Sequence, residues 1–392
     1  MGYLGRTPTP SPIDTSDIPA NSIDASKIID GAIAVADVAD NAITEAKIAD
    51  AAVVSLKSGR KNLIINGGMQ VAQRGTGAFT AANSFPVDRW AQISNTTDFT
   101  TTQSSIVPTG KGFNSSIKVQ PTVIKTSSTS TYARIGYKIE GYDGAGLCWG
   151  TSGAKSATIS FWVRASVAGI YSITPKNGAA NRSICLEYTI DSVDTWEYKT
   201  VTVPAVTDGT WDKTTGNFCY IDFWQAGLAG GTSTIGSWVS SNVNMSNNQV
   251  NLFASTSNTF YITGVQLELG SVATDFEHRS YGEELALCQR YYWRSEPVFR
   301  IPLSTNLNGG NDYNFCYIQH PVEMRVAPTI GYKDGDNNAT KFSYHSSSYW
   351  SNRINNLSQY HALLSSTGVR LVCNPYTGFD AFIKDFTADA EL

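Results

Sequence analysis

One seven-residue stretch, FCYIDFW at residues 218–224, combines aromatic rings with a carboxylate on one side of a predicted strand. Because successive side chains of a strand point to opposite faces, Tyr220, Asp222 and Trp224 share one face, and the residues between them share the other. Sugar binding uses aromatic faces for stacking and nearby polar groups for hydroxyls. Tyr220, Asp222 and Trp224 are therefore a candidate glycan-contact platform.

The stretch TISFWV at residues 158–163 also alternates, and it places Trp162 and Arg164 on the face opposite its apolar residues. Trp162 extends the predicted platform if its strand lies alongside that of Trp224. A second interpretation is that this face packs on a neighbouring chain or under a loop, since Tyr and Trp are also enriched at interfaces. The sequence leaves both interpretations open.

Another aromatic cluster is predicted near the end of the chain, in the loop-rich stretch at residues 343–361. Tyr349 and Trp350 are its candidate ligand-contact residues, because binding residues concentrate on loops held by a rigid scaffold. If the chain is anchored by its N-terminus, this region is the far tip, where a receptor would be met. Ordinary loop packing is the alternative.

Catalytic and metal motifs are missing from the sequence. It has no Gly-x-Ser-x-Gly, no His-Glu-x-x-His and no phosphate loop, and its six cysteines and four histidines lack zinc spacing. The carboxylates of Glu187, Asp222 and Glu268 could pair about 5–9 Å apart, as in a glycosidase, but sequence alone does not place them. We therefore expect no enzyme, no cofactor and no metal, and we expect free or buried thiols.

The composition favours an all-β protein. The 392 residues allow about two or three domains, 11% are aromatic, and only 16% are charged, against about 25% in an average soluble protein. The net charge of −4 and the lack of a basic tract argue against nucleic acid and anionic membrane as partners. No apolar run reaches the roughly 18 residues of a membrane span, and no signal peptide is evident, so synthesis in the cytoplasm is expected.

Short alternating strands with polar, Gly-rich turns predict a β-sandwich or jelly roll over residues 61–281. The clearest strands are at residues 158–163, 184–190, 199–203, 218–224 and 260–270. In the last of these the apolar phase slips at Gly264, which predicts a β-bulge. This sandwich is the scaffold that must position the aromatic candidates.

A connecting helix is predicted at residues 282–294, followed by a small β-domain at residues 295–392. Leu285, Cys288 and Tyr292 form a stripe at helical spacing, which would pack either at a three-fold axis or on the chain's own sandwich. In the β-domain, residues 314–332 predict two strands joined through His320 and Pro321. The strand pattern runs almost to the last residue, which predicts that this end is paired in a sheet.

The N-terminal part carries an aliphatic residue at every fifth position, with a ten-residue unit superimposed on it. The column consists of Ile13, Ile18, Ile23, Ile28, Ile33, Val38, Ile43, Ile48 and Val53. A step of five matches neither a helix, near 3.6, nor a strand, near 2. One aliphatic residue in five buries too little to order a single chain, whereas several chains around one axis could share the column. Residues 18–60 therefore predict an oligomerisation thread, most simply a homotrimer; a disordered linker is the alternative.

These N-terminal residues resemble those of bacteriophage tail fibres and related virion fibre proteins. The lead YLGRTPTP at residues 3–10 and the repeat DNAITEAKIAD at residues 40–50 carry the resemblance. It implies that residues 1–17, with Tyr3, Leu4, Pro8 and Pro10, dock on the virion and that the thread is trimeric. Residues 62–76 and 262–293 further resemble the start and end of a jelly-roll domain that is common in phage structural proteins and similar to carbohydrate-binding modules.

The resemblance implies a tail fibre that sits on the virion and recognises the host-cell surface, with a glycan as the expected receptor. Its expected partners are two further copies of itself, a tail adaptor or nozzle protein, and that receptor; no nucleic acid and no membrane insertion are expected. Weak sites suffice in such a fibre, because linked copies raise avidity. The alternatives are a purely structural or decorative fibre, a glycan-degrading spike, or a soluble lectin.

Overall fold

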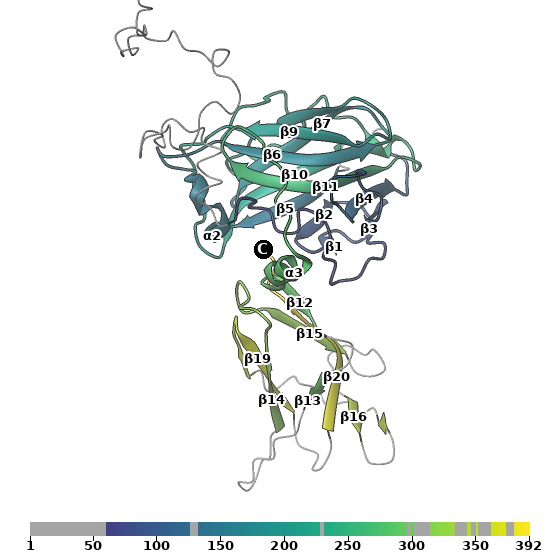
Figure 1. The fold of residues 1–392 in the computed structure, drawn as a ribbon, viewed down its shortest axis with the longest axis vertical. Coiled ribbons are helices and arrows are strands. Elements are labelled where there is room, and N and C mark those ends of the chain that lie inside the picture. Colours follow the sequence, from purple (N-terminus) through teal and green to yellow (C-terminus); the bar gives the residue numbers. More distant parts are fainter. Residues whose placement is uncertain are drawn as a thin grey trace, which may run out of the picture.

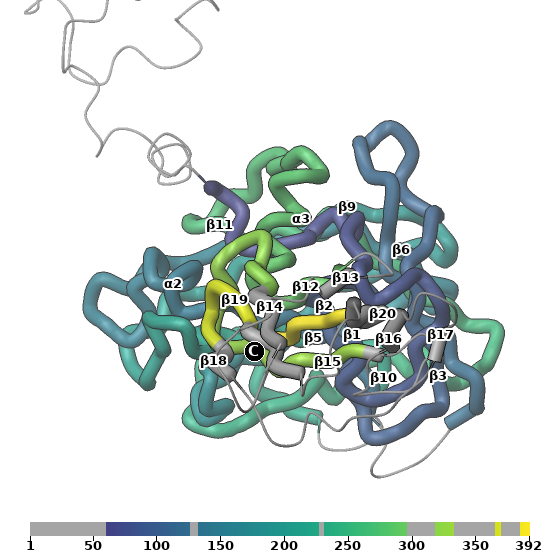
Figure 2. The backbone as a smooth tube through the Cα atoms, turned by 90° about the horizontal axis from the view of Figure 1, so that it is seen from below, coloured from purple at the N-terminus to yellow at the C-terminus, as the bar shows by residue number. Residues whose placement is uncertain are grey.

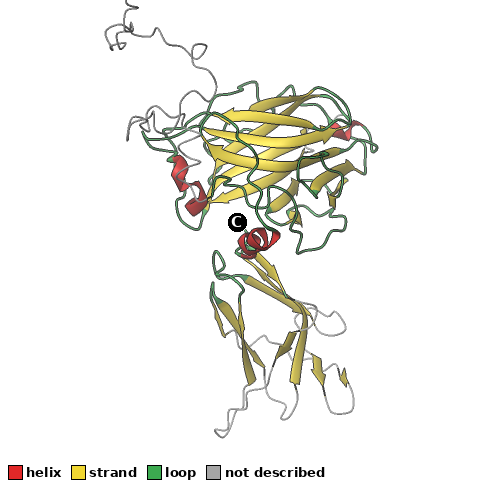
Figure 3. Ribbon diagram, viewed as in Figure 1, coloured by secondary structure: helices red, strands yellow, loops and turns green. Residues whose placement is uncertain are grey.

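The computed structural model describes residues 60–125, 132–227, 231–295, 299–301, 314–333, 343–345, 350–351, 362–373 and 380–392. Strands dominate these residues, and helices are few and short (Figures 1 and 3). The prediction of an all-β fold is confirmed. Of the predicted anchor and thread, residues 1–59 lie outside the described residues.

The larger unit is a sandwich of two antiparallel sheets. The first sheet has the order β1 (Ser84–Val87), β2 (Trp90–Ser94), β5 (Tyr132–Glu140), β10 (Asn217–Gly227), β7 (Gly169–Asn177) and β8 (Leu186–Ile190). The second has the order β3 (Phe99–Ser104), β4 (Ser116–Pro121), β11 (Phe260–Leu269), β6 (Ala157–Ala165) and β9 (Glu197–Val203). The strands predicted from alternation fall on β6, β8, β9, β10 and β11.

The core lies between the two sheets and is rich in aromatic residues. Phe161 of β6 meets Phe223 of β10 at a centroid distance of 5.3 Å, and both are fully buried. Trp90 of β2 adds a second contact to Phe223, at 6.1 Å. Each such side chain stabilises the fold by about 1.5–3 kcal/mol through its burial. The inward residues are those that the period-two pattern predicts.

The predicted bulge at Gly264 is confirmed. The pairing of β11 with β6 shifts register between Thr263 and Gln266, and Gly264 has φ of +62°. A Cβ atom there would lie 2.5 Å from Cζ of Phe113, so both the backbone and the space favour glycine. The bulge seats the ring of Phe113 on the outer side of this sheet.

The connecting helix is shorter than predicted. Helix α3 spans Tyr281–Gln289 and begins with a capping box between Ser280 and Glu283. Residues 292–294 form strand β12 instead of a further helical turn, because they pair with residues 387–389 of the last strand. Cys288 is fully buried in the core of the chain's own sandwich, which is one of the two predicted packings. The remaining helical elements are short: α2 (Gly141–Gly144), η5 (Ala145–Leu147) and η6 (Leu252–Ala254).

The C-terminal unit contains two small sheets. In the first, β20 (Asp380–Asp389) pairs with β12 (Tyr292–Arg294), β13 (Phe299–Ile301), β15 (Thr329–Lys333) and β16 (Ser343–His345), and β16 pairs with β17 (Trp350–Ser351). The second has the order β14 (Asn314–Gln319), β19 (Gly368–Cys373) and β18 (Ala362–Leu364). The strands predicted around His320 and Pro321 are β14 and β15, and they join different sheets. The predicted pairing of the chain end is confirmed by β20.

The last residues return to the sandwich after β20. Glu391 forms an ion pair with Arg89, and Lys138 Nζ donates a hydrogen bond to the backbone oxygen of Leu392. Arg325 of the C-terminal unit donates to the backbone oxygen of Thr215 at 2.7 Å. In Figure 1 the C label accordingly lies next to α3, between the sandwich and the C-terminal unit. Figure 2 shows the same chain from below, with the C-terminal unit in front of the sandwich.

Candidate glycan-contact surfaces

The outer face of the six-stranded sheet holds the first predicted platform. Tyr220, Asp222 and Trp224 lie on the side of β10 that faces away from the core, as their alternation predicts. Lys138 and Lys176 flank Tyr220 in register on β5 and β7, and each side chain in this row therefore meets its neighbours across the strands.

Asp222 is the centre of a buried charge network on this face. Its carboxylate lies 3.0 Å from Arg134 Nε and 2.8 Å from Lys176 Nζ, and the Asp222 side chain is fully buried. Lys176 is only 4% exposed, and it also contacts the amide oxygen of Asn242 at 3.4 Å. Both cations contact Oδ2, and burial keeps both carboxylate oxygens away from solvent.

Trp224 is buried as well, with only 1% of its surface exposed. Its indole nitrogen donates to Thr174 Oγ1 at 2.7 Å, and the guanidinium of Arg134 lies 4.9 Å from the ring centroid. Within residues 231–251, Trp238 packs on the core, and the later residues lie over this side of the sheet, where Gln249 donates to the backbone oxygen of Trp224 at 3.3 Å. Trp224 therefore offers no open ring face for stacking, and of the three predicted residues only Tyr220 is part-exposed.

A small cavity of about 170 Å³ lies on the same face, beside Lys138. Phe85, Ile93 and Leu392 contribute its apolar lining, and Arg89 and Glu391 contribute an ion pair. A Cβ atom on Gly136, which lines the cavity, would lie 2.8 Å from Asp222 Oδ1, so the cavity and the charge network are neighbours. Burial lowers the pKa of Lys138 at this position.

Trp162 lies on the other sheet. It is on β6, in the five-stranded sheet, and points away from the core. The condition under which Trp162 would extend the platform of Trp224 is therefore not met, because β6 pairs with β9 and β11. Instead, Trp162 is in register with Tyr198 of β9, at a ring-centroid distance of 5.4 Å, and Tyr198 is 43% exposed.

Two more aromatic side chains adjoin this pair on the five-stranded sheet. Trp196 lies just before β9 and contacts Tyr261 of β11 at 6.3 Å, and Arg164 lies 5.6 Å from the Tyr261 ring. We call Trp162, Trp196, Tyr198 and Tyr261 the aromatic patch. The sequence reasoning missed three of its members, although TWEYKTVTV at residues 195–203 carries the signal: aromatic residues alternate with the inward Val201 and Val203.

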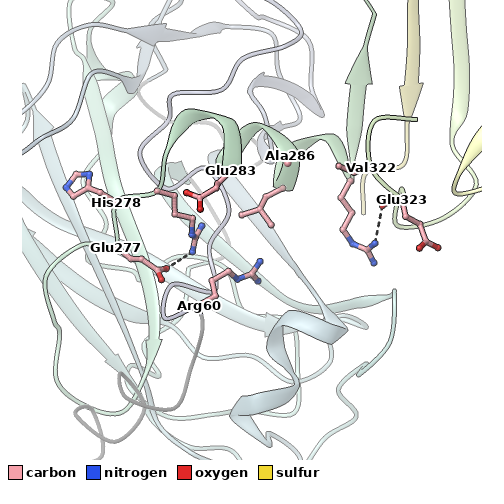
Figure 4. Close-up of a pocket in the computed structure, with 10 residues that line it drawn as sticks. Arg60, Glu277, His278, Glu283, Ala286, Val322 and Glu323 are labelled. Carbon is pink, nitrogen blue, oxygen red and sulfur yellow. Dashed lines mark hydrogen bonds and ion pairs between the residues drawn. The ribbon is translucent and has the colours of Figure 1, made fainter. Parts of the chain in front are cut away.

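A groove of about 620 Å³ follows helix α3 at the junction of the two units. Figure 4 shows Arg60 facing the helix across it, with His278 at one end and Val322 and Glu323 at the other. The arginines that line it are already paired: Arg60 with Asp143, Arg279 with Glu277 at 2.7 Å and Arg290 with Glu140 at 2.6 Å. The positive and negative side chains of the groove therefore balance, and the groove does not favour a ligand of either charge.

The three candidate catalytic carboxylates do not come together, because Glu268 lies on a different sheet from Glu187 and Asp222. Glu268 lies on the five-stranded sheet and accepts from the backbone nitrogen of Thr274 at 2.9 Å. Glu187 lies on the other sheet, where Ser246 and Asn248 donate to it. Within the described ranges, no group of three His, Cys, Asp or Glu side chains could hold a metal ion. The thiols of Cys185, Cys219 and Cys288 are free and buried, and Cys148 is free and half-buried.

Two predicted residues have no described side chain. Tyr349 lies outside the described residues, and Trp350 is described only as part of strand β17. In the part of the chain that the structure covers, no helix has the length and apolar character needed to cross a membrane.

Comparisons with known proteins identify no family for this chain. No family's sequence profile matches it, and no curated protein matches it. Among solved structures, the enzymatically active domain of tailspike protein 4 of bacteriophage CBA120 is 14% identical over 53% of this chain and 21% of its own length, with a TM-score of 0.30.

Two carbohydrate-binding proteins show similar values. The family 11 carbohydrate-binding module of a Clostridium thermocellum cellulosomal cellulase is 15% identical over 53% of this chain and 99% of its own, with a TM-score of 0.25. A xylan-binding domain from Paenibacillus barcinonensis is 7% identical over 55% and 100%, with a TM-score of 0.28. These TM-scores are too low to carry a functional argument, which must come from the side chains described above.

Proposed function

We propose that this chain is a glycan-binding fibre protein of a bacteriophage virion and that it contacts the host-cell surface through the aromatic patch. The observation that supports binding at the patch is the ring pair of part-exposed Trp162 and exposed Tyr198 on the outer side of a sheet. Aromatic side chains whose rings lie outside the core and reach solvent are typical of recognition surfaces. The proposed role is binding without catalysis.

The patch has the rigidity that a binding surface needs. Trp162 is on β6, which is hydrogen-bonded on both sides, to β9 and to β11. Tyr261 is only 5% exposed and is fixed in place beneath Arg164. Tyr261 is thus part of the support, and a ligand that stacks on Trp162 and Tyr198 loses little affinity to ordering of the protein.

Binding by variants of the full chain tests this proposal. Trp162→Ala and Tyr198→Ala are expected to weaken adsorption to host cells or to isolated surface polysaccharide by about tenfold each. Thr200→Ala is the matched control, because Thr200 is exposed on the same side of β9. Unchanged adsorption in both aromatic variants, with unchanged melting temperature, would reject the patch as the contact surface.

The fibre role rests on the N-terminal sequence, whose five-residue aliphatic column and phage-like lead support a trimer anchored to the tail. Light scattering on the full chain and on a chain beginning at Asn62 tests it. A mass near three times 42.4 kDa that falls on truncation is expected. A monomer in both forms would contradict the trimer.

A purely structural fibre is the second candidate, and one observation favours it. Trp224 and Asp222, which the sequence offers as ligand contacts, are packed under the later residues of 231–251 and carry no open face. In such a fibre the groove along α3, which starts at Arg60 where the predicted thread ends, would take a neighbouring copy of the chain. Virions carrying Trp162→Ala would then adsorb normally.

A further inference from the structure

Three cations lie on or beside the aromatic patch. Lys111 Nζ lies 5.3 Å from the ring centroid of Trp162, and Lys111 is exposed. Lys118 of β4 is in register with Tyr261 of β11 and is half-buried. Arg164 is the third, above the Tyr261 ring. Both ring pairs of the patch, Trp162 with Tyr198 and Trp196 with Tyr261, therefore have a positive charge next to them.

These charges are poorly compensated. In the ranges that the structure describes, Lys111 and Lys118 have no carboxylate within ion-pair distance, and Arg164 has one, Asp194, at 3.4 Å. Asp194 is itself 53% exposed, and such solvated pairs attract weakly. Glu197, the other nearby carboxylate, is held by Lys199 at 2.6 Å. The patch therefore carries a local positive surplus, although the whole chain has a net charge of −4.

The cations on the outer face of the six-stranded sheet provide a comparison. There, Arg134 and Lys176 both converge on the carboxylate of Asp222, which neutralises part of their charge. Among Lys111, Lys118 and Arg164, by contrast, the described residues place one carboxylate within ion-pair distance, and this carboxylate, of Asp194, is solvent-exposed and contacts only Arg164 of the three. A ligand that carries a negative charge can therefore supply the partner that these cations lack.

We propose that the aromatic patch binds an acidic polysaccharide, one whose sugar rings carry carboxylates. Sugar rings stack on Trp162 and Tyr198, and the carboxylates face Lys111 on one side and Arg164 with Lys118 on the other. Charge-assisted hydrogen bonds of this kind are stronger than neutral ones and are planar and bidentate at arginine. This inference rests on the proposed glycan-binding function and adds the class of glycan.

The experiment compares acidic polymers with their uncharged counterparts. Polygalacturonate, alginate and hyaluronate are titrated into the full chain, each alongside its carboxyl-reduced form. We expect at least one acidic polymer to bind tenfold or more tightly than its reduced form, with affinity that falls between 50 mM and 300 mM salt because exposed charges are screened.

Variants assign the effect to the patch. Lys118→Gln, Lys111→Gln and Arg164→Gln are each expected to weaken acidic binding about two- to fivefold and to leave any binding of the reduced polymer unchanged. Lys213→Gln is the matched control, since Lys213 is an exposed lysine in the loop before β10. Trp162→Ala is expected to weaken both kinds of binding.

The outcomes separate this inference from the function it rests on. Equal binding of acidic and reduced polymers, lost in Trp162→Ala, would overturn the acidic class and keep glycan binding at the patch. Binding of acidic polymers that Lys213→Gln weakens as much as Lys118→Gln would overturn the inference, because the attraction would then be unspecific. Failure of all six polymers to bind would overturn it too, and host-cell adsorption by Trp162→Ala would then decide the proposed function.

Discussion

The outer faces of the two sheets contain similar residue types, but these residues differ in burial and in the pairing of their charges. On the six-stranded sheet, Trp224 is covered and Asp222 holds two cations in a buried network. On the five-stranded sheet, Trp162 is part-exposed, Tyr198 is 43% exposed and the adjacent cations are largely unpaired. A count of aromatic and charged residues would not distinguish the two faces.

Two local features produce the difference. The later residues of 231–251 lie over the first face, where Ser246 and Gln249 hydrogen-bond to residues of β7 and β10. The carboxylate of Asp222 then neutralises part of the charge of Arg134 and Lys176 and engages both cations. An aromatic side chain on an outer sheet face is therefore a binding residue only if nothing in the same chain covers it.

The largest effect is expected from breaking the buried network. Asp222→Ala leaves Arg134 and Lys176 next to each other without their shared carboxylate and should lower the free energy of unfolding by about 3–5 kcal/mol, measured by urea denaturation. Trp224→Ala should lose a similar amount through the cavity it leaves. Asp194→Ala, at the other face, is the control and should lose less than about 1 kcal/mol. A loss below 1 kcal/mol in Asp222→Ala would show that the network is hydrated.

A second prediction concerns Asp88, in the turn between β1 and β2 of the covered sheet. Burial raises its pKa from 3.8 to about 6, against the opposing effect of Arg74. The folded state therefore binds the proton more tightly than the unfolded state, so the free energy of unfolding falls as pH rises from about 4 to about 6, by about 3 kcal/mol. Asp88→Asn should flatten this part of the pH profile and stabilise the protein at pH 7.

Asp98 provides the matched control for Asp88. Its pKa is lowered, mainly by a hydrogen bond from Lys125. Asp98→Asn should therefore lose stability at pH 7 and not gain it, since the ionised form is the one that the folded state favours. Thermal melts of both variants between pH 4 and pH 8 check this, and equal shifts in the two variants would contradict the assignment to Asp88.

A third, smaller effect separates binding from stability at the open face. Trp162→Ala should lower glycan affinity about tenfold, because it removes one exposed ring, and should change the free energy of unfolding by only about 1 kcal/mol. Trp224→Ala should lower the free energy of unfolding strongly and leave the glycan affinity of the folded fraction unchanged. If both tryptophan variants lose affinity in proportion to stability, the two faces do not differ in function.

The smallest effect is expected at Asp194, the carboxylate that competes for Arg164. Asp194→Asn should leave stability within about 0.5 kcal/mol and raise affinity for an acidic polymer about twofold, because it frees the guanidinium. Titration at low salt is the measurement. A fall in affinity would show that Asp194 positions Arg164 and does not compete with the ligand.

Much of the sandwich was predictable because alternation is a local property. TISFWV on β6 and FCYIDFW on β10 each show which residues face the core, and the phase slip in β11 marks the bulge at Gly264. The same alternation places Trp162 and Trp224 on outer faces. Strand periodicity thus fixed which way each side chain points.

The rest depends on contacts between distant residues. Alternation does not say that β6 and β10 belong to different sheets, and it gives no sign that the later residues of 231–251 cover Trp224. Tyr292 continues the helical stripe in sequence but lies in β12, because pairing with Asp389, 97 residues away, outweighs the helical pattern. Such outcomes are decided by long-range pairing, which no short window contains.

The pairing of β12 with β20 has a consequence for exchange of the C-terminal unit. Tyr292, where the chain leaves α3 for this unit, is in register with Asp389, where the chain comes back to the sandwich. The two ends of the unit therefore lie side by side, held by Arg74 on Asp389 and by Arg89 on Glu391. Within the unit, β15 pairs with the same residues of β20, and Arg325 donates to the backbone oxygens of Thr215 and Glu391. A different sequence grafted between β12 and the end of β20 would therefore leave the sandwich intact if it kept the Arg325 segment, so the part of the chain beyond that segment can be exchanged as a cassette.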